Sequence, residues 1–407
     1  MRYQPPRNNE FVLCLLFLLV SASSVSRLPT PAASAQTAAA PRSTQSQQSQ
    51  TVAPGIEYLQ VTRGTATLDE STGPWSINLL RVDLNRARVE VVHALDEGVG
   101  LETVSSIAAR HQAVAAVNSG YFRTTGTFRG ESVGVLLLKR KLISEPHNDR
   151  AAVGFIKSAT STEVVFGHLK FSAKIAARGS GHAVAGFNRP LARDELILFT
   201  PEFHRTTLTT PEGVEAVVRK GRVSVMRDLY GSSEIPGDGF VVSAVGSARQ
   251  WLTKNLRRGS RLVLSAQLIP IDSKQADLWR RAETIVGGGP QLVKDGKIAI
   301  TNEQEKIAPA FVSDRHPRTA IAKLRSGKLL LVTVDGRQPG ISVGMSLTTL
   351  ADLLLEFGAV EAINLDGGGS TTMIVHNRVV NRPSDSTGER PVSDAILIFS
   401  RTNEGKP

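Results

Sequence analysis

The sequence predicts an α+β fold in which β-rich mixed sheets carry a few packed helices. Of its 407 residues, 41% are hydrophobic and 21% are charged, which is the composition of a globular chain with a sizeable core. Short β-prone runs bounded by Gly, Pro, Asn or Asp recur along the chain, for example at 56–62 and 113–117. Helical periodicity is confined to short stretches such as 346–357. We therefore expect one large domain over residues 56–403, with 155–280 as an optional inserted β-rich lobe.

The N-terminus has the anatomy of a secretory signal peptide. Arg2 and Arg7 precede an apolar run at 11–20, and a small-residue cleavage site follows that ends at Ala35. A run of this length is too short for a permanent transmembrane helix. We predict a signal peptide over residues 1–35, with Ala22 as the second choice of cleavage site. The expected localisation is secreted or periplasmic, and an uncleaved N-terminal membrane anchor is the less favoured alternative.

Composition, cysteine content and net charge limit the classes of fold and function that the chain can belong to. Residues 36–55 are rich in Ala, Ser, Gln, Thr and Pro, and are predicted to be a disordered linker. Cys14 is the single cysteine and lies inside the predicted signal peptide, so disulfides play no part in the expected fold. The net charge is +11, of which +9 remains without the three Arg and one Glu of residues 1–35. This excess favours anionic partners, but the chain carries no nucleic-acid-binding motif and only 5% aromatics.

The first part of the predicted domain is strand-rich. Runs at 56–62, 75–83 and 87–94 read as a β-meander, and Thr103 or Glu102 caps a short helix that ends near residue 111. A buried strand at 113–117 follows.

That strand ends in Asn118-Ser-Gly-Tyr-Phe122, where Gly120 permits a tight turn. Asn118 and Tyr121 are candidate sugar contacts, although a turn Asn and a packed aromatic are the ordinary alternatives. Glu131, in a glycine-bracketed polar loop, is a second carboxylate to test, although a loop Glu is usually only solvated. The run Gly287-Gly-Gly-Pro290 is a permissive loop, and neither a P-loop nor a dinucleotide fingerprint occurs in the sequence.

A strand, helix, strand arrangement follows in the C-terminal third. An apolar run ends at Asp335-Gly336, a helix starts after its N-cap Ser346 and stops before Gly358, and a buried strand leads to Asp366. Ligands favour such strand ends.

Asp366 opens the most distinctive stretch of the sequence. Gly367, Gly368 and Gly369 remove every Cβ from the turn and bring backbone N–H groups within reach of an anion or a sugar hydroxyl. Three hydroxyl side chains follow on a hairpin strand, beginning with Ser370 and Thr371. We interpret this stretch as the floor of an active site. An ordinary glycine-rich hairpin with an exposed Asp is the alternative.

Four motifs together resemble the phosphodiester glycosidase family. They are Asn364-Leu-Asp-Gly-Gly-Gly-Ser370, Pro317-Arg-Thr-Ala-Ile321, Asp335-Gly336 and Asn118-Ser-Gly-Tyr-Phe122. The resemblance runs from about residue 110 to residue 400 with a poorly matching middle. It implies an exported hydrolase that cleaves the glycosidic bond of a sugar-1-phosphodiester in an envelope or extracellular glycan, such as an exopolysaccharide.

The resemblance also implies roles for individual residues. Asp366 would face the anomeric carbon or its attacking water, with Asp335 and Glu131 as candidate partners. Arg318 would hold the phosphate through its planar guanidinium, helped by the N–H groups of the glycine turn. The remaining predicted substrate contacts are Asn118, Tyr121, Thr319, Asn364, Gly367, Gly368, Gly369, Ser370 and Thr371.

Several alternatives stay open from the sequence. No cofactor is required by the expected chemistry, although Ca²⁺ or Mg²⁺ between Asp335 and Asp366 is an option. A non-catalytic glycan-binding envelope module and a phosphodiesterase that cleaves the P–O bond are the competing functions. The sequence leaves the stereochemical outcome, the sugar and the oligomeric state undetermined, and it carries none of the common zinc-hydrolase or serine-hydrolase motifs.

Overall fold

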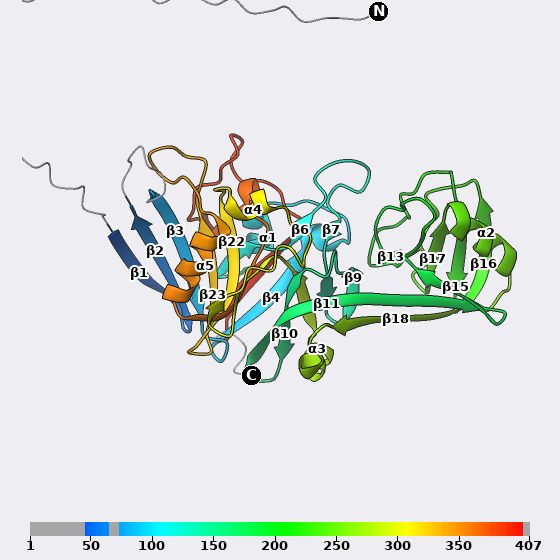
Figure 1. The fold of residues 1–407 in the computed structure, drawn as a ribbon, viewed down its shortest axis with the longest axis horizontal. Helices are drawn as coiled ribbons and strands as arrows, with labels where there is room; N and C mark the ends of the chain where they lie inside the picture. Colours follow the sequence, from blue (N-terminus) through cyan, green and yellow to red (C-terminus); the bar gives the residue numbers. More distant parts are fainter. Residues whose placement is uncertain (1–44, 65–72, 402–407) are drawn as a thin grey trace, which may run out of the picture. The chain divides into compact units, whose positions relative to one another are not determined.

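The computed structural model of this chain describes residues 45–64 and 73–401. These residues fall in a single compact unit of the fold. The predicted α+β class is confirmed, because several β-sheets dominate the described residues and few helices accompany them (Figure 1). The predicted signal peptide at 1–35 lies outside the described residues. None of the helices in the described ranges is long and apolar enough to cross a membrane.

The largest sheet has eight strands, and each neighbouring pair is antiparallel. Its order is β1 (Gln45–Ala53), β2 (Ile56–Arg63), β3 (Trp75–Val82), β23 (Leu329–Val334), β22 (Arg318–Leu324), β24 (Ala359–Asn364), β20 (Gln291–Lys294) and β21 (Lys297–Ile298).

Helix α5 (Leu347–Glu356) covers one face of the eight-stranded sheet. The Ser346 hydroxyl accepts a hydrogen bond from the Thr349 N–H, and Gly358 follows the helix with a φ of +87°, so both predicted helix-end signals are confirmed. Leu350 and Leu354 are buried against this sheet. Since apolar residues recur on one side of α5, the helix gains most of its stability from this packing.

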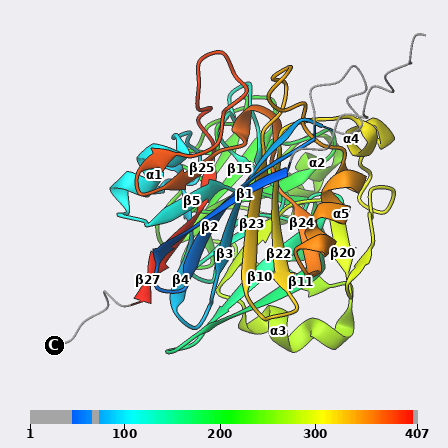
Figure 2. The same cartoon turned by 90° about the vertical axis from the view of Figure 1, so that its left-hand side faces the viewer.

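A five-stranded sheet packs against the opposite face. Its order is β26 (Arg378–Val379), β25 (Met373–Val375), β5 (Ala115–Asn118), β27 (Asp394–Ser400) and β4 (Ala87–His93). The two sheets share one apolar core, to which Ile321 and Ile363 contribute from the first sheet and Val117 and Ile396 from the second. Helix α1 (Val104–Arg110) covers its outer face, and Figure 2 shows α1 beside β5 and β25, with α5 beside β24 and β20.

A third sheet extends the same core. It contains seven strands, namely β12 (Ser180–Val184), β11 (Thr162–Ala177), β10 (Ala151–Lys157), β19 (Thr284–Gly287), β8 (Leu136–Leu138), β9 (Lys141–Ser144) and β18 (Val263–Pro270), which pairs with β11. Val153 and Val286 reach the shared core from this sheet. A two-stranded ribbon of β6 (Tyr121–Phe122) and β7 (Ser132–Val133) follows β5.

The segment between β11 and β18 forms a further sheet with its own core. Its strands are β13 (Gly186–Phe187), β14 (Leu196–Phe199), β17 (Gly239–Ala244), β15 (Val214–Arg219) and β16 (Arg222–Asp228), and helix α2 (Gly246–Asn255) packs on it. Figure 1 shows the long strands β11 and β18 that enter and leave this segment. The short helices α3 (Ala276–Arg281) and α4 (Pro309–Ser313) complete the described helices.

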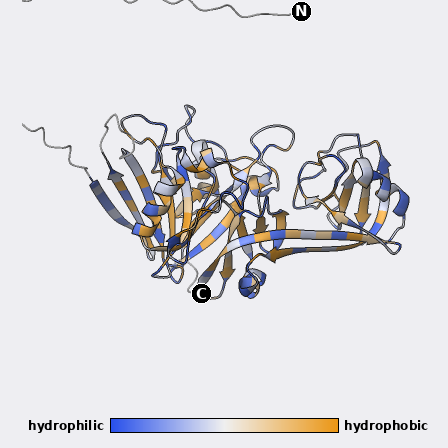
Figure 3. Cartoon of the chain, viewed as in Figure 1, coloured by the Kyte–Doolittle hydropathy of each residue, from blue (hydrophilic) through white to orange (hydrophobic). Residues whose placement is uncertain are grey.

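The N-terminal part departs from the sequence-based expectation in two places. Residues 45–53, predicted as part of a disordered linker, form the edge strand β1, whose side chains are mostly exposed and hydrophilic (Figure 3). Backbone pairing with β2 orders this strand although its side chains bury little, and we propose that the folded domain starts near residue 45. The predicted β-meander is wrong in its third strand, because β4 leaves β3 and pairs with β27 in the other sheet. A local pattern identifies a strand but does not specify its partner.

Candidate functional site

The sheet topology gathers the predicted motifs at one end of the two packed sheets. Strands β23 and β24 are both antiparallel to β22, which lies between them. Their C-terminal ends and the N-terminal end of β22 therefore lie at the same end of the sheet. This places Asp335, Arg318 and Asp366 near one another, as the predicted strand, helix, strand arrangement requires.

The glycine turn carries the chain between the two sheets at this end. It leaves β24 of the eight-stranded sheet and enters β25 of the five-stranded sheet, where β25 pairs with β5. The predicted hairpin after it is confirmed, with His376 and Asn377 at positive φ between β25 and β26. Asn118, at the end of β5, thereby comes next to the turn.

Asp366 is half-buried at the start of this turn. Its N–H donates to the Ser119 carbonyl at 3.1 Å, and its own carbonyl accepts from Asn118 Nδ2 at 2.6 Å. Burial raises the pKa of its carboxyl to about 7, and the negative charge of Asp394 acts in the same direction. The Ser370 hydroxyl, the Arg390 charge and the Gly367 N–H lower this pKa in part. The carboxyl consequently titrates near neutral pH, as a catalytic acid or base must.

The glycines of the turn mainly allow neighbouring protein atoms to pack closely against its backbone, and they contribute less to anion binding. The Gly368 N–H donates to the Pro317 carbonyl, and the N–H groups of Ser370 and Thr371 donate to turn carbonyls. These three donors are therefore used inside the protein, and among them the Gly368 N–H is one of the glycine N–H groups predicted to hold an anion. A Cβ on Gly367 would lie 2.7 Å from the Pro317 carbonyl oxygen, and one on Gly368 would lie 3.2 Å from Arg337 Nη2.

Polar side-chain atoms without partners surround the turn. Among the described residues, four such buried atoms lie at this end of the sheets, namely Ser119 Oγ, Asn364 Oδ1, Thr371 Oγ1 and Thr372 Oγ1. A buried polar group without a hydrogen bond costs about 1–3 kcal/mol. Such a concentration indicates a place where a polar ligand or ordered water completes the hydrogen bonding.

Tyr121 and Asn364 meet over the glycine loop that follows β19. The Tyr121 hydroxyl donates to the Gly289 carbonyl at 2.8 Å, and Asn364 Nδ2 donates to the Tyr121 oxygen at 2.7 Å. Burial and the Asp366 charge raise the pKa of Tyr121, so its hydroxyl stays protonated at neutral pH. The Arg150 guanidinium lies over the Tyr121 ring, 5.4 Å from its centroid.

Asn118 and Thr319 are buried beneath the site and hold it in place. Asn118 Oδ1 accepts from the Thr319 hydroxyl at 2.8 Å and from the Thr372 N–H at 3.1 Å. With its Nδ2 on the Asp366 carbonyl, the Asn118 amide joins three chain segments. These contacts make Asn118 a positioning residue, and its direct sugar contact stays a prediction.

Asp335 is a buried carboxylate whose hydrogen bonds hold other segments of the chain in place. Its Oδ1 accepts from the Arg382 N–H at 2.9 Å and from Asn381 Nδ2 at 3.2 Å, and its Oδ2 accepts from the Ser76 hydroxyl at 2.9 Å. The catalytic role of Asp335 stays a prediction, and the geometry favours a structural role, because three hydrogen-bond donors face a carboxylate that is almost fully buried. The same donors do not fit a Ca²⁺ or Mg²⁺ ion between Asp335 and Asp366. The described residues also contain no group of three or more His, Cys, Asp or Glu side chains suited to a metal.

Arg318 likewise points away from an incoming anion. Its Nε donates to the Met345 carbonyl at 2.9 Å, and its Nη2 donates to the carbonyls of Phe311 and Asp314 at 2.8 and 2.7 Å. Its side chain is almost fully buried, and its guanidinium lies 4.9 Å from the centroid of the Phe311 ring. The phosphate-binding role of Arg318 stays a prediction, and these contacts disfavour it, since backbone carbonyls already bind its Nε and Nη2.

Arg337 is a site residue that the sequence analysis missed. It has a φ of +60°, its side chain reaches over Gly368, and its Nη2 donates to His316 Nδ1 at 3.4 Å. Burial and the charges of Arg318 and Arg337 lower the pKa of His316, so this ring is neutral at pH 7. No carboxylate pairs with Arg337 within residues 45–64 and 73–401. In the sequence, Arg337 could have been identified as a candidate from its position directly after Asp335-Gly336.

Two further charged residues near the site were also missed. Asp394 accepts from the Gly120 N–H at 2.8 Å and raises the pKa of Asp366. Arg390 forms a bidentate ion pair with Asp385 beside Gly369. No sequence pattern marks either residue, because tertiary folding alone brings them to the glycine turn.

Glu131 lies elsewhere, in a polar cavity of about 370 Å³ lined also by Arg123, Glu145 and Arg189. Its Oε2 accepts from Arg123 Nε at 2.9 Å. Asp394, and not Glu131, is the acidic residue that influences the pKa of Asp366.

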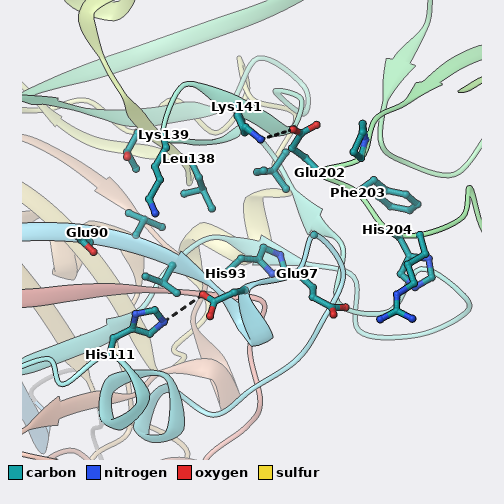
Figure 4. A pocket seen from close by; sticks show the side chains of 18 of the residues that line it. Glu90, His93, Glu97, His111, Leu138, Lys139, Lys141, Glu202, Phe203 and His204 are labelled. Atoms are coloured by element: carbon teal, nitrogen blue, oxygen red, sulfur yellow. Dashed lines mark ion pairs between the residues drawn. The ribbon is translucent and has the colours of Figure 1, made fainter. Parts of the chain in front are cut away.

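A larger cavity of about 550 Å³ contains none of the predicted site residues (Figure 4). It lies between β4, the β8–β9 hairpin and the loop at 201–205, where Lys141 pairs with Glu202 at 3.1 Å. Its size alone does not make it the functional site.

Comparisons with known proteins confirm the family resemblance. Residues 212–399 match the family described as phosphodiester glycosidase. This match includes Arg318, Asp335 and the glycine turn, whereas Asn118, Tyr121 and Glu131 lie before it.

The curated relatives match over short segments. A 110-residue segment is 34% identical to the N-acetylglucosamine-1-phosphodiester alpha-N-acetylglucosaminidase of Bos taurus, covering 25% of this chain and 20% of the bovine protein. Another 110-residue match is 36% identical to the prophage-derived protein YomE of Bacillus subtilis, covering 27% of this chain and 16% of that protein. The matched part thus spans a fifth or less of the length of these two relatives.

A solved structure shares the fold more broadly. A protein from Burkholderia pseudomallei K96243 superposes with a TM-score of 0.77 over 88% of this chain and 97% of its own, at 22% sequence identity. At this identity the likeness concerns the fold alone.

Proposed function

We propose, from its resemblance to the phosphodiester glycosidase family, that this chain is an exported hydrolase that cleaves the glycosidic bond of a sugar-1-phosphodiester in an envelope or extracellular glycan. The observation that carries the proposal is the environment of Asp366. A half-buried carboxyl with a pKa of about 7 lies among unpartnered hydroxyls, with the Arg337 guanidinium across the same glycine turn.

The proposed reaction is a substitution at the anomeric carbon, in which one C–O bond forms and another breaks. A water oxygen ends bound to that carbon, and the phosphate monoester leaves with the electron pair of the broken C–O bond. Asp366, as a carboxylate, stabilises the positive charge at the anomeric carbon, either by attacking it or by taking the proton of the attacking water. The configuration of the sugar product distinguishes these two forms of the mechanism. Neither form requires a cofactor.

The phosphate is assigned to Arg337 instead of Arg318. A phosphate monoester is a stable leaving group near neutral pH, so neutralising its charge matters more than protonating it. Arg337 has no carboxylate partner in the described part of the chain and can present its planar fork to two phosphate oxygens. Arg150, over the Tyr121 ring, is a second cation on the Tyr121 side of the site.

The other predicted substrate contacts have different proposed roles, which follow from their geometry. The hydroxyl of Thr371 and the Oδ1 of Asn364 have no partner in the described residues and are proposed to bind substrate, whereas the Ser370 hydroxyl is proposed to hold the Asp366 carboxyl, and Tyr121 closes the wall of the site. Export is proposed from the N-terminal signal sequence.

Hydrolysis in ¹⁸O-labelled water tests the reaction. Purified protein is incubated with N-acetylglucosamine-1-phosphodiesters, other hexose-1-phosphodiesters and neutral aryl glycosides, and the products are analysed by mass spectrometry. We expect the label in the sugar hydroxyl. Label in the phosphate would instead indicate P–O cleavage, and glycan binding without hydrolysis would indicate a non-catalytic module.

A further inference from the structure

A second polar cavity adjoins the candidate site, and its chemistry differs from that of an anion site. It has a volume of about 370 Å³, within the range of small-molecule pockets. Its polar lining comes mainly from Arg123, Glu131, Glu145, His147, Asn148 and Arg189.

The charges of this cavity are balanced in pairs. Arg123 Nε donates to Glu131 Oε2 at 2.9 Å, and Arg189 Nε donates to Glu145 Oε1 at 2.7 Å. Arg189 also pairs with Glu195. A free anion would meet two arginines that already bind the carboxyl groups of Glu131, Glu145 and Glu195, so the lining does not favour phosphate.

The same lining offers hydrogen-bonding capacity that the protein does not use. Glu145 Oε2 is buried and has no partner in the described ranges. Burial raises the pKa of Glu131 and of Glu145 to about 7, so near neutral pH each carboxyl can act as donor or acceptor. The Arg123 side chain is 42% exposed and keeps donors beyond the Nε that binds Glu131. Fixed charged groups with both donor and acceptor capacity match the adjacent hydroxyls of a sugar ring.

The cavity lies beside the β6–β7 ribbon, which also carries Tyr121 of the candidate site. Its lining residues Ser132, Val133 and Gly134 also border a small internal void, too narrow for a water molecule, whose other lining includes Tyr121 and Asp394. Tyr121 pairs with Val133 in the β6–β7 ribbon, so this ribbon separates the cavity from the site at Asp366. A glycan that is bound at Asp366 and long enough to cross this ribbon would reach the cavity.

We propose that this cavity binds one neutral sugar ring of the glycan substrate through the carboxyl groups of Glu131 and Glu145 and the guanidinium of Arg123. The inference rests on the proposed function and deepens it, because it assigns a neutral sugar next to the scissile phosphodiester. It also gives Glu131 a role in substrate binding in place of the catalytic role predicted from the sequence.

Direct binding tests the proposal without relying on turnover. The Asp366→Asn protein is titrated with methyl N-acetyl-α-glucosaminide, methyl α-glucoside and inorganic phosphate, with saturation-transfer NMR as the readout. We expect at least one neutral sugar to bind. Adding Glu131→Gln or Glu145→Gln to Asp366→Asn should weaken the affinity for this sugar by roughly tenfold or more, since hydrogen bonds to charged groups contribute about 1.5–3 kcal/mol. Glu202→Gln, in the other cavity, is the matched control and should leave binding unchanged.

Kinetics separates this role from a catalytic one. On an active phosphodiester glycoside, Glu131→Gln should raise KM with kcat nearly unchanged, whereas loss of a catalytic group would lower kcat. Thermal unfolding of each variant checks that the Arg123 pair is not needed for folding. Absence of binding by every neutral sugar, displacement of the sugar by phosphate, or equal affinity in the Gln variants would overturn the proposal. None of these outcomes touches the ¹⁸O result, so the proposed function is judged separately.

Discussion

Asn118 Nδ2 donates a 2.6 Å hydrogen bond to the backbone carbonyl of Asp366, a residue 248 positions further along the chain. The bond joins the end of a strand in one sheet to the turn that leaves the other sheet. Because Asn118 Oδ1 also accepts from Thr319 and Thr372, one amide fixes the backbone on which the proposed catalytic carboxyl is mounted.

Replacing Asn118 should therefore cost both stability and activity. Asn118→Ala leaves the Asp366 carbonyl and the Thr372 N–H buried without partners, and each costs about 1–3 kcal/mol. We expect the free energy of unfolding to fall by at least about 2 kcal/mol in urea titrations. Ser119→Ala is the matched control, since its hydroxyl has no partner among the described residues, and should change stability by less than about 0.5 kcal/mol. Equal effects of the two substitutions would contradict the positioning role.

Asp366→Asn should abolish turnover while preserving the fold. The substitution removes the charge but hardly changes the volume of the side chain, and the backbone contacts of Asp366 remain. Asp335→Asn should behave in the opposite way and lower stability first, because three donors face its carboxylate. Initial rates on phosphodiester glycosides, together with thermal unfolding, distinguish the two. Near-normal kinetics in Asp366→Asn would show that the site is misplaced.

Activity should depend on pH through the Asp366 carboxyl. Its proposed role requires the carboxylate, and its pKa is about 7, so kcat should rise with pH through about 7 and fall below it. Asp394→Asn removes a negative charge that raises this pKa, so it should shift the midpoint of the profile to lower pH. An unchanged midpoint would exclude Asp366 as the titrating group.

The raised pKa of Asp366 also predicts that the stability contributed by this carboxyl falls as pH rises, whereas activity should rise. A carboxyl whose pKa is higher in the folded than in the unfolded state makes the folded protein hold its proton more tightly. Its contribution to stability is therefore lost as pH rises from about 4, the unfolded value, through about 7. Asp366→Asn should flatten this decline, so at pH 8 the variant should unfold at the same or a higher temperature than the native protein. A lower unfolding temperature at pH 8 would contradict this assignment.

Arg337→Ala should weaken phosphodiester hydrolysis selectively. Loss of one charge-assisted phosphate contact costs about 1.5–3 kcal/mol, or roughly tenfold to more than a hundredfold in kcat/KM. Any neutral aryl glycoside that the native protein cleaves should be affected much less. Comparison of the two substrate classes in native and variant protein gives the answer, and an equal loss on both would refute the phosphate assignment.

Arg318→Ala should instead act through stability. Its Nε and Nη2 donate to three loop carbonyls beneath the site, so its removal leaves buried acceptors unpaired and a cavity beside Phe311. We expect a loss of about 3 kcal/mol or more in the free energy of unfolding. Intact stability together with a selective loss of phosphodiester hydrolysis would restore Arg318 as the phosphate ligand.

Local patterns in the sequence determined the elements that carry the site. The apolar period and caps of 346–358, the glycine turn after Asp366 and the hairpin at 373–379 depend on residues close together in the chain, and all three occur as predicted. The family resemblance rests on the same local motifs.

Only the tertiary structure decided which charged side chains face the site. Arg318 and Asp335 carry the motifs, yet backbone carbonyls bind Arg318 and donors from distant segments surround Asp335. Arg337, in contrast, is left without a carboxylate partner in the described residues. Asp394 reaches Asp366 and Glu131 enters a separate cavity because strand pairing joins segments that are far apart in the sequence. The identity of a side chain fixes what chemistry it can perform, but its partners and burial depend on the packing of the whole chain.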